Sequence, residues 1–255
     1  MTRKPYGVLI VHGFTSSLDC VCGIEPPLSA LGLPTRMPVL RGHGAESPEA
    51  LRGVTWHDWV ADAEAALKDL LTEVDRAILF GHSMGGTVAL ILAADYADVV
   101  DSIVVAAAVV QLTSPFAPGR PFHFLAPLVT RLLKKVDMPP TYAEPALAEY
   151  DTNYAWAPTD AIASLFEFAD VTRRRLPAVR VPTLIMQSRR DTTVAPESAQ
   201  IIYEGISTPP DQKRIAWFEV TEHEMFRDCE RGATIGTVVD YVRERAGLAG
   251  QSTRG

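Results

Sequence analysis

The stretch of sequence that decides the fold reads Ala77-Ile78-Leu79-Phe80-Gly81-His82-Ser83-Met84-Gly85-Gly86. It begins as a short apolar run, which is typical of a buried strand, and leads into residues 84–97, whose nearly all-apolar character is typical of a buried helix. The pattern Gly-x-Ser-x-Gly lies between them. Such a pattern places a serine on a sharp, strained turn, where Gly81 and Gly85 avoid the collision of side chains. We therefore predict that Ser83 is a nucleophile whose hydroxyl projects above a sheet edge.

The segments on either side of Ser83 strengthen this interpretation. The pattern alone is weak evidence because glycine and serine are common residues, and an ordinary glycine-rich turn with an incidental serine is the alternative. With a strand before it and a helix after it, the pattern favours a nucleophile. The helix would also direct its first amides and the positive end of its dipole toward the serine.

Other apolar runs rich in β-branched residues predict further strands. They occupy residues 7–11, 36–40, 103–107, 183–187 and 215–220. Their hydrophobicity is continuous, not alternating, as expected for strands of a parallel sheet that is covered on both faces. Helical patterns, such as those of residues 56–71 and 235–246, alternate with the strands. The sequence therefore predicts an α/β fold with a mostly parallel central sheet flanked by helices.

One long segment interrupts this alternation. Residues 111–181 show no strand signal, and a structureless loop of that length is uncommon in a compact domain. Apolar residues recur at helical spacing within 124–133 and 162–169, and prolines separate these patterns. We expect residues 1–110 and 182–255 to form the core domain and residues 111–181 to form a small helical cap inserted into it.

Composition and charge exclude several classes of protein. The 255 residues carry a net charge of -7, which disfavours a nucleic-acid partner. No apolar run is long enough for a transmembrane segment, and the first apolar run is too short for a secretory signal, so a cytoplasmic location is expected. The three cysteines fit neither a disulfide framework nor a zinc site. We expect no metal or organic cofactor, a small-molecule substrate, and a monomer or weak homo-oligomer.

Several motifs together resemble the serine hydrolases of the α/β-hydrolase superfamily, and within it the carboxylesterase and monoacylglycerol lipase group. They are His12-Gly13-Phe14-Thr15, Arg41-Gly42-His43-Gly44-Ala45-Glu46-Ser47, Gly81-His82-Ser83-Met84-Gly85-Gly86, and the late residues Asp191 and His223. These motifs span nearly the whole chain and leave only the cap uncovered. The resemblance implies the α/β-hydrolase fold, a triad in the chain order serine, acid, histidine, and ester hydrolysis.

A serine hydroxyl needs a base within hydrogen-bond reach to act as a nucleophile. Six histidines are candidates. His223 follows the last predicted strand, where the chain order of the family places the base. His12 and His82 lie inside the motif segments, where a structural role is favoured. The alternative for His223 is a solvated loop histidine.

The acid of the triad should orient the imidazole and stabilise its positive charge. Asp191 lies in the loop after the strand at 183–187, which matches the position of the acid in the family. It could instead cap a turn or pair with the two preceding arginines. Glu222 and Glu224, which flank the candidate base, are unusual for the group and could raise the pKa of the imidazole.

The resemblance also implies an oxyanion hole formed by the backbone N–H groups of Phe14 and Met84. The ring of Phe14 either lines the acyl pocket or belongs to the core. The function expected is hydrolysis of carboxylic esters of short to medium acyl chains, including monoacylglycerols, through an acyl-enzyme intermediate. The alternatives are a carbon–carbon hydrolase, a perhydrolase or an acyltransferase with the same residues, or a non-catalytic ligand receptor.

Overall fold

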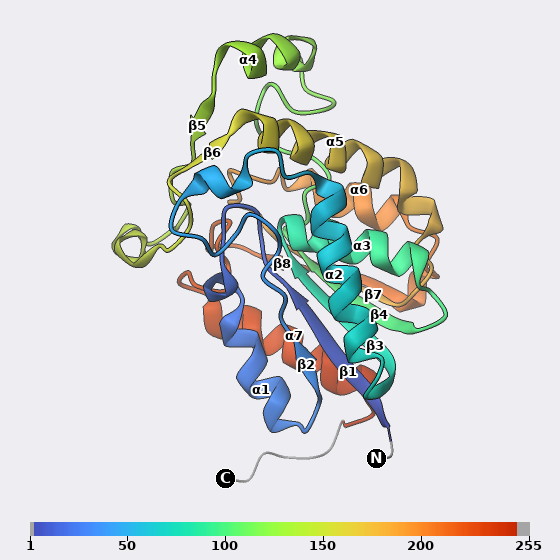
Figure 1. Ribbon diagram of the computed structural model, residues 1–255. Coiled ribbons are helices and arrows are strands. Elements are labelled where there is room, and N and C mark those ends of the chain that lie inside the picture. The colour runs from blue at the N-terminus through green and yellow to red at the C-terminus, as the bar shows by residue number, and fades with distance from the viewer. Residues whose placement is uncertain (1–2, 249–255) are drawn as a thin grey trace.

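The computed structural model describes residues 3–248 and is built around a six-stranded sheet in which all neighbouring strands are parallel (Figure 1). The strand order is β2-β1-β3-β4-β7-β8. The bounds of these strands are β1 Lys4–Val11, β2 Thr35–Arg36, β3 Val74–His82, β4 Val100–Ala106, β7 Thr183–Ser188 and β8 Lys213–Phe218. The α/β class predicted from the sequence is confirmed.

Helices cover both faces of the sheet. The helices of one face are α2 (Trp56–Leu70), α3 (Met84–Asp95), α5 (Thr159–Arg175) and α6 (Glu197–Gly205), and those of the other are α1 (Glu25–Ala30) and α7 (Arg231–Arg245). Alternate residues of each strand enter different cores: Leu9 of β1 packs with the first group and Ile10 with the second. Because the strand residues on both faces of the sheet are apolar, the strands lack an alternating pattern.

The strand register brings three loops to one edge of the sheet. Val11, at the end of β1, lies opposite Gly81 of β3. Ala106, at the end of β4, lies between His82 of β3 and Met186 of β7. Because these strands are parallel, the loops that follow β1, β3 and β7 all emerge at their common carboxyl edge. In α/β folds this edge is where ligands bind.

The strands expected at 7–11 and 103–107 begin earlier than predicted, at Lys4 and Val100, and two other predicted strands differ more. The strand expected at 36–40 is reduced to Thr35–Arg36, because Pro38 has no N–H to donate and the N–H of Leu40 donates to Nε2 of His12 at 3.0 Å. The strand expected at 215–220 is shifted to Lys213–Phe218. Its predicted end leaves the sheet because the N–H of Val220 donates to the Glu230 carboxylate at 3.0 Å.

The segment 111–181 contains the two expected helical regions, as α4 (Ala126–Leu132) and α5. It also contains an antiparallel pair of short strands that the sequence did not predict, β5 (Lys135–Asp137) and β6 (Trp156–Pro158). Figure 1 shows α4 at the top of the molecule, far from the sheet, with α5 running beneath it. Helix α5 joins the core, where Phe168 stacks on Trp56 of α2 with ring centroids 5.2 Å apart.

None of the helices within residues 3–248 combines the length and the hydrophobicity that a membrane span requires.

Candidate active site

Ser83 occupies the tight turn between β3 and α3. Its φ is 55°, in the left-handed region that non-glycine residues seldom adopt. A Cβ atom on Gly81 would lie 2.1 Å from the carbonyl oxygen of Gly85, and one on Gly85 would lie 2.2 Å from the carbonyl oxygen of Val11. Both positions therefore require glycine, which is the steric reason for the Gly-x-Ser-x-Gly pattern.

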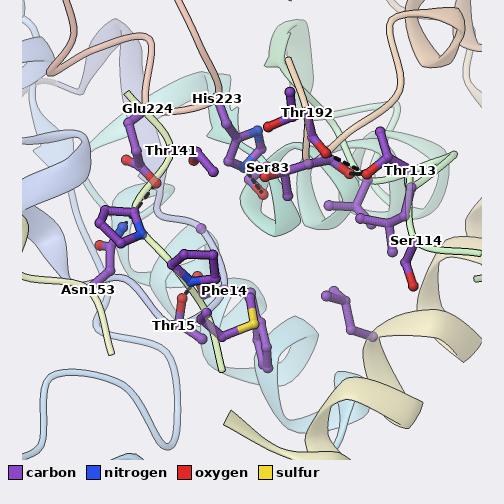
Figure 2. Close-up of a pocket in the computed structure, with 18 of the residues that line it drawn as sticks. Phe14, Thr15, Ser83, Thr113, Ser114, Thr141, Asn153, Thr192, His223 and Glu224 are labelled. Carbon is purple, nitrogen blue, oxygen red and sulfur yellow. Dashed lines mark hydrogen bonds between the residues drawn. The ribbon is translucent and has the colours of Figure 1, made fainter. Parts of the chain in front are cut away.

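The structure brings the three candidate triad residues together. Nε2 of His223 lies 3.0 Å from Oγ of Ser83, and Nδ1 of the same ring lies 3.0 Å from Oδ2 of Asp191. Figure 2 shows the His223 ring above the serine. With the Nδ1 proton donated to the carboxylate, Nε2 is free to accept the serine proton. The arrangement has the hydrogen-bond order that activates a serine nucleophile.

Asp191 is held in place from several directions. Its Oδ1 accepts the N–H groups of Thr193 at 2.9 Å and Val194 at 2.8 Å, and its Oδ2 also accepts from Nε2 of Gln187 at 3.0 Å. The residue thus caps a turn and contacts His223 at the same time. The alternative ion pair is not observed for Arg189, whose guanidinium stacks on the Trp217 ring at 3.7 Å.

Hydrogen bonds to its backbone groups hold the loop that carries His223 in place. His82 donates from Nε2 to the carbonyl oxygen of His223 at 2.9 Å. Burial, together with the nearby His223, lowers the pKa of His82 to about 3, so this ring is neutral. The buried carboxylate of Asp228 accepts the N–H groups of Glu222 at 2.7 Å and Ala143 at 2.9 Å. These bonds fix the imidazole over Ser83 and join its loop to the segment 111–181.

The electrostatic surroundings favour a protonated His223. Burial acts to lower the pKa of the ring, but the charge and hydrogen bond of Asp191 oppose it, and Glu224 and Glu222 add to that opposition. Together they raise the pKa of His223 to about 9. The direction agrees with the expectation that the two flanking glutamates raise it. Such an environment stabilises the imidazolium that forms when the serine gives up its proton.

The two expected oxyanion donors lie on either side of Ser83. Met84 is the first residue of α3, so its N–H has no acceptor within the helix. The loop after β1 passes close to the serine, because a Cβ atom on Gly13 would lie 3.2 Å from Cβ of Ser83. Among the described residues, we find no acceptor for the N–H of Phe14. Two backbone donors near the nucleophile are what an oxyanion hole requires.

Both interpretations of the Phe14 ring hold in part. The ring lines the cavity above Ser83, and it also packs edge-to-face on Trp59 with centroids 5.6 Å apart. The next residue, Thr15, has a φ of 61°, which is rare for a β-branched residue. Its carbonyl oxygen accepts the N–H of Tyr154 at 2.8 Å, so a hydrogen bond from segment 111–181 helps to hold this strained loop.

A cavity of about 340 Å³ opens directly above the triad. Its apolar wall includes Val109, Leu112, Val136, Met138, Ile162, Leu165 and Phe166. Its polar groups include Thr15, Thr141, Asp151, Asn153 and Glu224 (Figure 2 labels four of these). Such a combination of apolar surface with a few convergent polar groups is typical of a small-molecule site.

No sequence pattern pointed to Asn153 as part of this site, whereas His82 lies within the Gly-x-Ser-x-Gly pattern and was expected to have a structural role. Asn153 lies 71 residues from Glu224, its hydrogen-bond partner, so their proximity had no local signal. The sequence indicated for Glu224 only an effect on the pKa of the neighbouring imidazole. Its position directly after the candidate base was the one signal that could have identified it as a residue of the cavity.

The fold and this constellation define the class of the protein, an α/β-hydrolase with a serine-type site. Residues 4–230 match the model of the Hydrolase_4 family, described as serine aminopeptidase, S33, and the chain belongs to this family. This match and the similarity to curated esterase and monoacylglycerol lipase sequences bear out the resemblance that the motifs indicated.

Two curated relatives are similar along nearly their whole length. The thermostable monoacylglycerol lipase of Bacillus sp. (strain H-257) is 27% identical over 245 residues, which cover 95% of this chain and 92% of the lipase. The carboxylesterase of Bacillus subtilis (strain 168) is 26% identical over 253 residues, which cover 96% and 98% of the two chains.

Solved structures confirm the fold. A structure described with the metagenome-derived lipolytic enzymes LipS and LipT superimposes with a TM-score of 0.85 at 25% identity, over 95% of each chain. A soluble variant of monoglyceride lipase from Saccharomyces cerevisiae, in complex with a substrate analogue, gives a TM-score of 0.77 at 16% identity. The match covers 96% of this chain and 88% of the yeast protein.

Proposed function

We propose that this protein hydrolyses carboxylic esters of short to medium acyl chains, including monoacylglycerols, through an acyl-enzyme intermediate on Ser83. The observation that carries this proposal is the hydrogen-bonded series from Asp191 through His223 to Ser83, with both distances at 3.0 Å, beneath a largely apolar cavity. The names of the two Bacillus relatives support the same reaction class.

In the first half of the reaction, Oγ of Ser83 attacks the ester carbonyl while Nε2 of His223 accepts its proton. The resulting imidazolium is stabilised by Asp191, which stays ionised. The carbonyl oxygen becomes an oxyanion and accepts hydrogen bonds from the backbone N–H groups of Phe14 and Met84. The protonated His223 then donates its proton to the leaving alcohol, and the acyl group remains on the serine.

In the second half, His223 takes a proton from water as the water attacks the acyl-enzyme. The tetrahedral intermediate uses the same two backbone donors, and its collapse returns the proton to Ser83 and releases the carboxylic acid. Replacement of water by another nucleophile would give acyl transfer or perhydrolysis with the same residues. The identity of the second nucleophile therefore separates the proposed function from these alternatives.

We also propose that residues 111–181 act as an inserted cap that sets specificity, on a core of residues 1–110 and 182–255. The segment supplies much of the cavity wall, including Met138, Ile162 and Phe166. A cap that contributes apolar side chains and leaves the triad to the core can change substrate preference without changing the chemistry. The monomeric or weakly oligomeric state and the cytoplasmic location stay predictions from the sequence.

A serine-directed fluorophosphonate tests the nucleophile. The wild-type protein should be labelled at Ser83, whereas Ser83→Ala should not be labelled and should lose ester turnover by about 10⁶-fold. Ser29→Ala, which removes an exposed serine hydroxyl, is the matched control and should behave as wild type. Full turnover by Ser83→Ala would refute the proposal.

A series of nitrophenyl and glycerol esters of increasing acyl length tests the substrate range. We expect the highest kcat/KM at short to medium chains, with the free acid as product in water. A maximum at long chains with interfacial activation would contradict the acyl range. Efficient transfer of the acyl group to an added alcohol or to hydrogen peroxide, in preference to water, would favour the alternatives instead.

A further inference from the structure

Glu224 is a buried carboxyl group of the active-site cavity that the triad does not use. The residue is 7% exposed and lines the same cavity as Ser83. Its Oε1 accepts a hydrogen bond from Nδ2 of Asn153 at 2.9 Å. Within residues 3–248, its Oε2 is buried and has no hydrogen-bond partner. A buried polar atom without a partner destabilises the folded protein, more so when it is charged, so it requires an explanation.

The neighbouring side chains do not supply the missing donor. Arg227 is the nearby cation, but its Nη1 lies 3.4 Å from Oδ1 of Asp151. The hydroxyl of Tyr142 also donates to Asp151, at 3.1 Å. His223 has both ring nitrogens engaged in the triad. Burial is the main cause that raises the pKa of Glu224, with Asp151 adding to it against the opposing charges of His223 and Arg227 and the hydrogen bond of Asn153.

The carboxyl group is nevertheless held in a defined position. Asn153, which donates to it, accepts in turn from Oγ of Ser16 at 2.8 Å. The backbone N–H of Glu224 donates to the carbonyl oxygen of Thr141 at 3.4 Å. Three segments, the loop after β1, the segment 111–181 and the His223 loop, therefore converge on this side chain. A polar group fixed in advance by its neighbours is suited to binding a ligand with little loss of entropy.

We propose that Oε2 of Glu224 accepts a hydrogen bond from a free hydroxyl on the alcohol part of the ester, so that the enzyme prefers esters of polyols over esters of simple alkanols. This inference rests on the proposed function. An acyl chain has no hydrogen-bond donor, so the group that satisfies Glu224 belongs to the alcohol. The leaving alcohol must also lie beside His223, which gives it a proton, and Glu224 is the next residue.

The distribution of polar groups around Ser83 supports this assignment. Figure 2 shows Glu224, Thr141 and Asn153 on one side of the His223 ring, with Thr113 and Ser114 on the other. The hydroxyl group of Thr113 already donates to backbone carbonyl oxygens, and that of Ser114 accepts the N–H of Phe116. A hydroxyl that reaches Glu224 would thus orient the alcohol and leave the apolar wall to the acyl chain.

The test compares two esters with the same acyl chain, a glycerol monoester and the ethyl ester, which lacks free hydroxyl groups. The measured quantity is the ratio of their kcat/KM values. We expect Glu224→Leu to lower this ratio about 10- to 100-fold, the range typical of a lost hydrogen bond to a charged or strongly polar group. Glu224→Gln keeps the shape and one acceptor oxygen, so the ratio should fall less than in Glu224→Leu.

Glu219→Gln is the matched control, because Glu219 is an exposed glutamate on the same connection and does not line the cavity. It should leave the ratio unchanged. The rate of fluorophosphonate labelling reports separately on the triad. Because the charge of Glu224 helps to raise the pKa of His223, Glu224→Gln should move the pH profile of labelling to lower pH, an effect that is common to both esters and cancels in their ratio. An unchanged ester ratio in both Glu224 variants would overturn the inference.

Two other results would also overturn it. Equal losses on both esters together with slower labelling would show that Glu224 acts through His223 and not on the substrate. A larger Glu224-dependent preference for choline esters over their uncharged 3,3-dimethylbutyl analogues would assign the carboxyl to a cation. If the wild-type protein is labelled but cleaves neither ester, the proposed function is refuted together with this inference. If it cleaves the esters and the Glu224 variants leave the ratio of the two kcat/KM values unaltered, only this inference is refuted.

Discussion

The two sides of the active-site cavity are built differently. On the triad side, His223 and Asp191 are both buried and are bound to backbone groups of neighbouring loops. On the side of residues 111–181, the wall residues Val136, Met138 and Phe166 are only half-buried. We therefore expect the chemistry to depend on the loops at the sheet edge and the shape of the cavity to depend on residues 111–181.

This contrast has an energetic basis. A triad must hold its atoms within a few tenths of an ångström, and buried hydrogen bonds to the backbone provide such precision. A wall that contacts an acyl chain needs only apolar surface, because each methylene contributes a modest and non-directional energy. Changes on the triad side should therefore reduce turnover of every ester, whereas changes on the cap side should alter which ester is preferred.

The largest effect in this comparison is expected for Asp191→Asn. The amide oxygen would remain opposite the N–H groups of Thr193 and Val194, so the amide NH2 would face Nδ1 of His223. The imidazole would then carry its proton on Nε2 and could not accept from Ser83. We expect turnover to fall about 10⁴-fold for all acyl lengths, the effect typical of this change in a serine triad.

Steady-state kinetics on short and medium nitrophenyl esters measure this loss. Asp211→Asn, at an exposed position away from the cavity, is the control and should retain wild-type kinetics. If turnover falls less than tenfold in Asp191→Asn, or falls for only one acyl length, Asp191 is not the acid of the triad.

The second prediction concerns pH. His223 acts as a base only when it is neutral, and its pKa is raised to about 9. At pH 7 about one molecule in a hundred would have a neutral ring, so kcat/KM should rise about tenfold per pH unit and level off above about pH 9. Asp191→Asn removes a cause of the raised pKa and should move the residual activity to lower pH. A wild-type profile already level at pH 7 would contradict this prediction.

The same shift affects stability with a defined sign. Because the pKa of His223 is higher in the folded protein than its ordinary value of 6.5, the protonated ring stabilises the fold at acidic pH. This contribution is fully present below about pH 6.5 and is lost as the pH rises through about 9. The Tm should therefore decline between about pH 6.5 and pH 9, a range in which kcat/KM still increases.

The smallest effect is expected on the cap side. Phe166 lines the cavity, and Phe166→Ala should enlarge the apolar wall and move the optimum toward longer acyl chains, changing relative kcat/KM values about tenfold. Phe124→Ala, at a ring that is 74% exposed and outside the cavity, should leave the chain-length profile unchanged. If Phe166→Ala lowers kcat/KM equally for every ester, the cap side affects catalysis itself and not only the preference for acyl length.

The parts of the molecule that the sequence predicted are those with local or repeated signals. The turn at Ser83 was predictable because steric demands place glycine at both Gly81 and Gly85. The sheet was predictable because both of its faces are covered, which makes its strands uniformly apolar. Asp191 and His223 followed from the chain order implied by the family motifs, and the structure places them in contact.

The unpredicted parts depend on contacts between distant residues. Strands β5 and β6 have three residues each and pair across a long connection, so neither has a pattern of its own. The short β2 depends on the imidazole of His12, which takes the N–H of Leu40. The bond between Asn153 and Glu224 joins two loops 71 residues apart. Such features are set by tertiary structure and have no local sequence signature.

The position of β8 at the outer edge of the sheet has a consequence for the folding of the chain. Ser83 and His223 are separated by 140 residues, and the loop after β8 must return across β7 and β4 to join them. A growing polypeptide can thus form the serine turn well before its base exists, and contacts of such sequence separation form slowly. Appearance of fluorophosphonate reactivity during refolding would therefore mark the docking of the final strand, and not the collapse of the core.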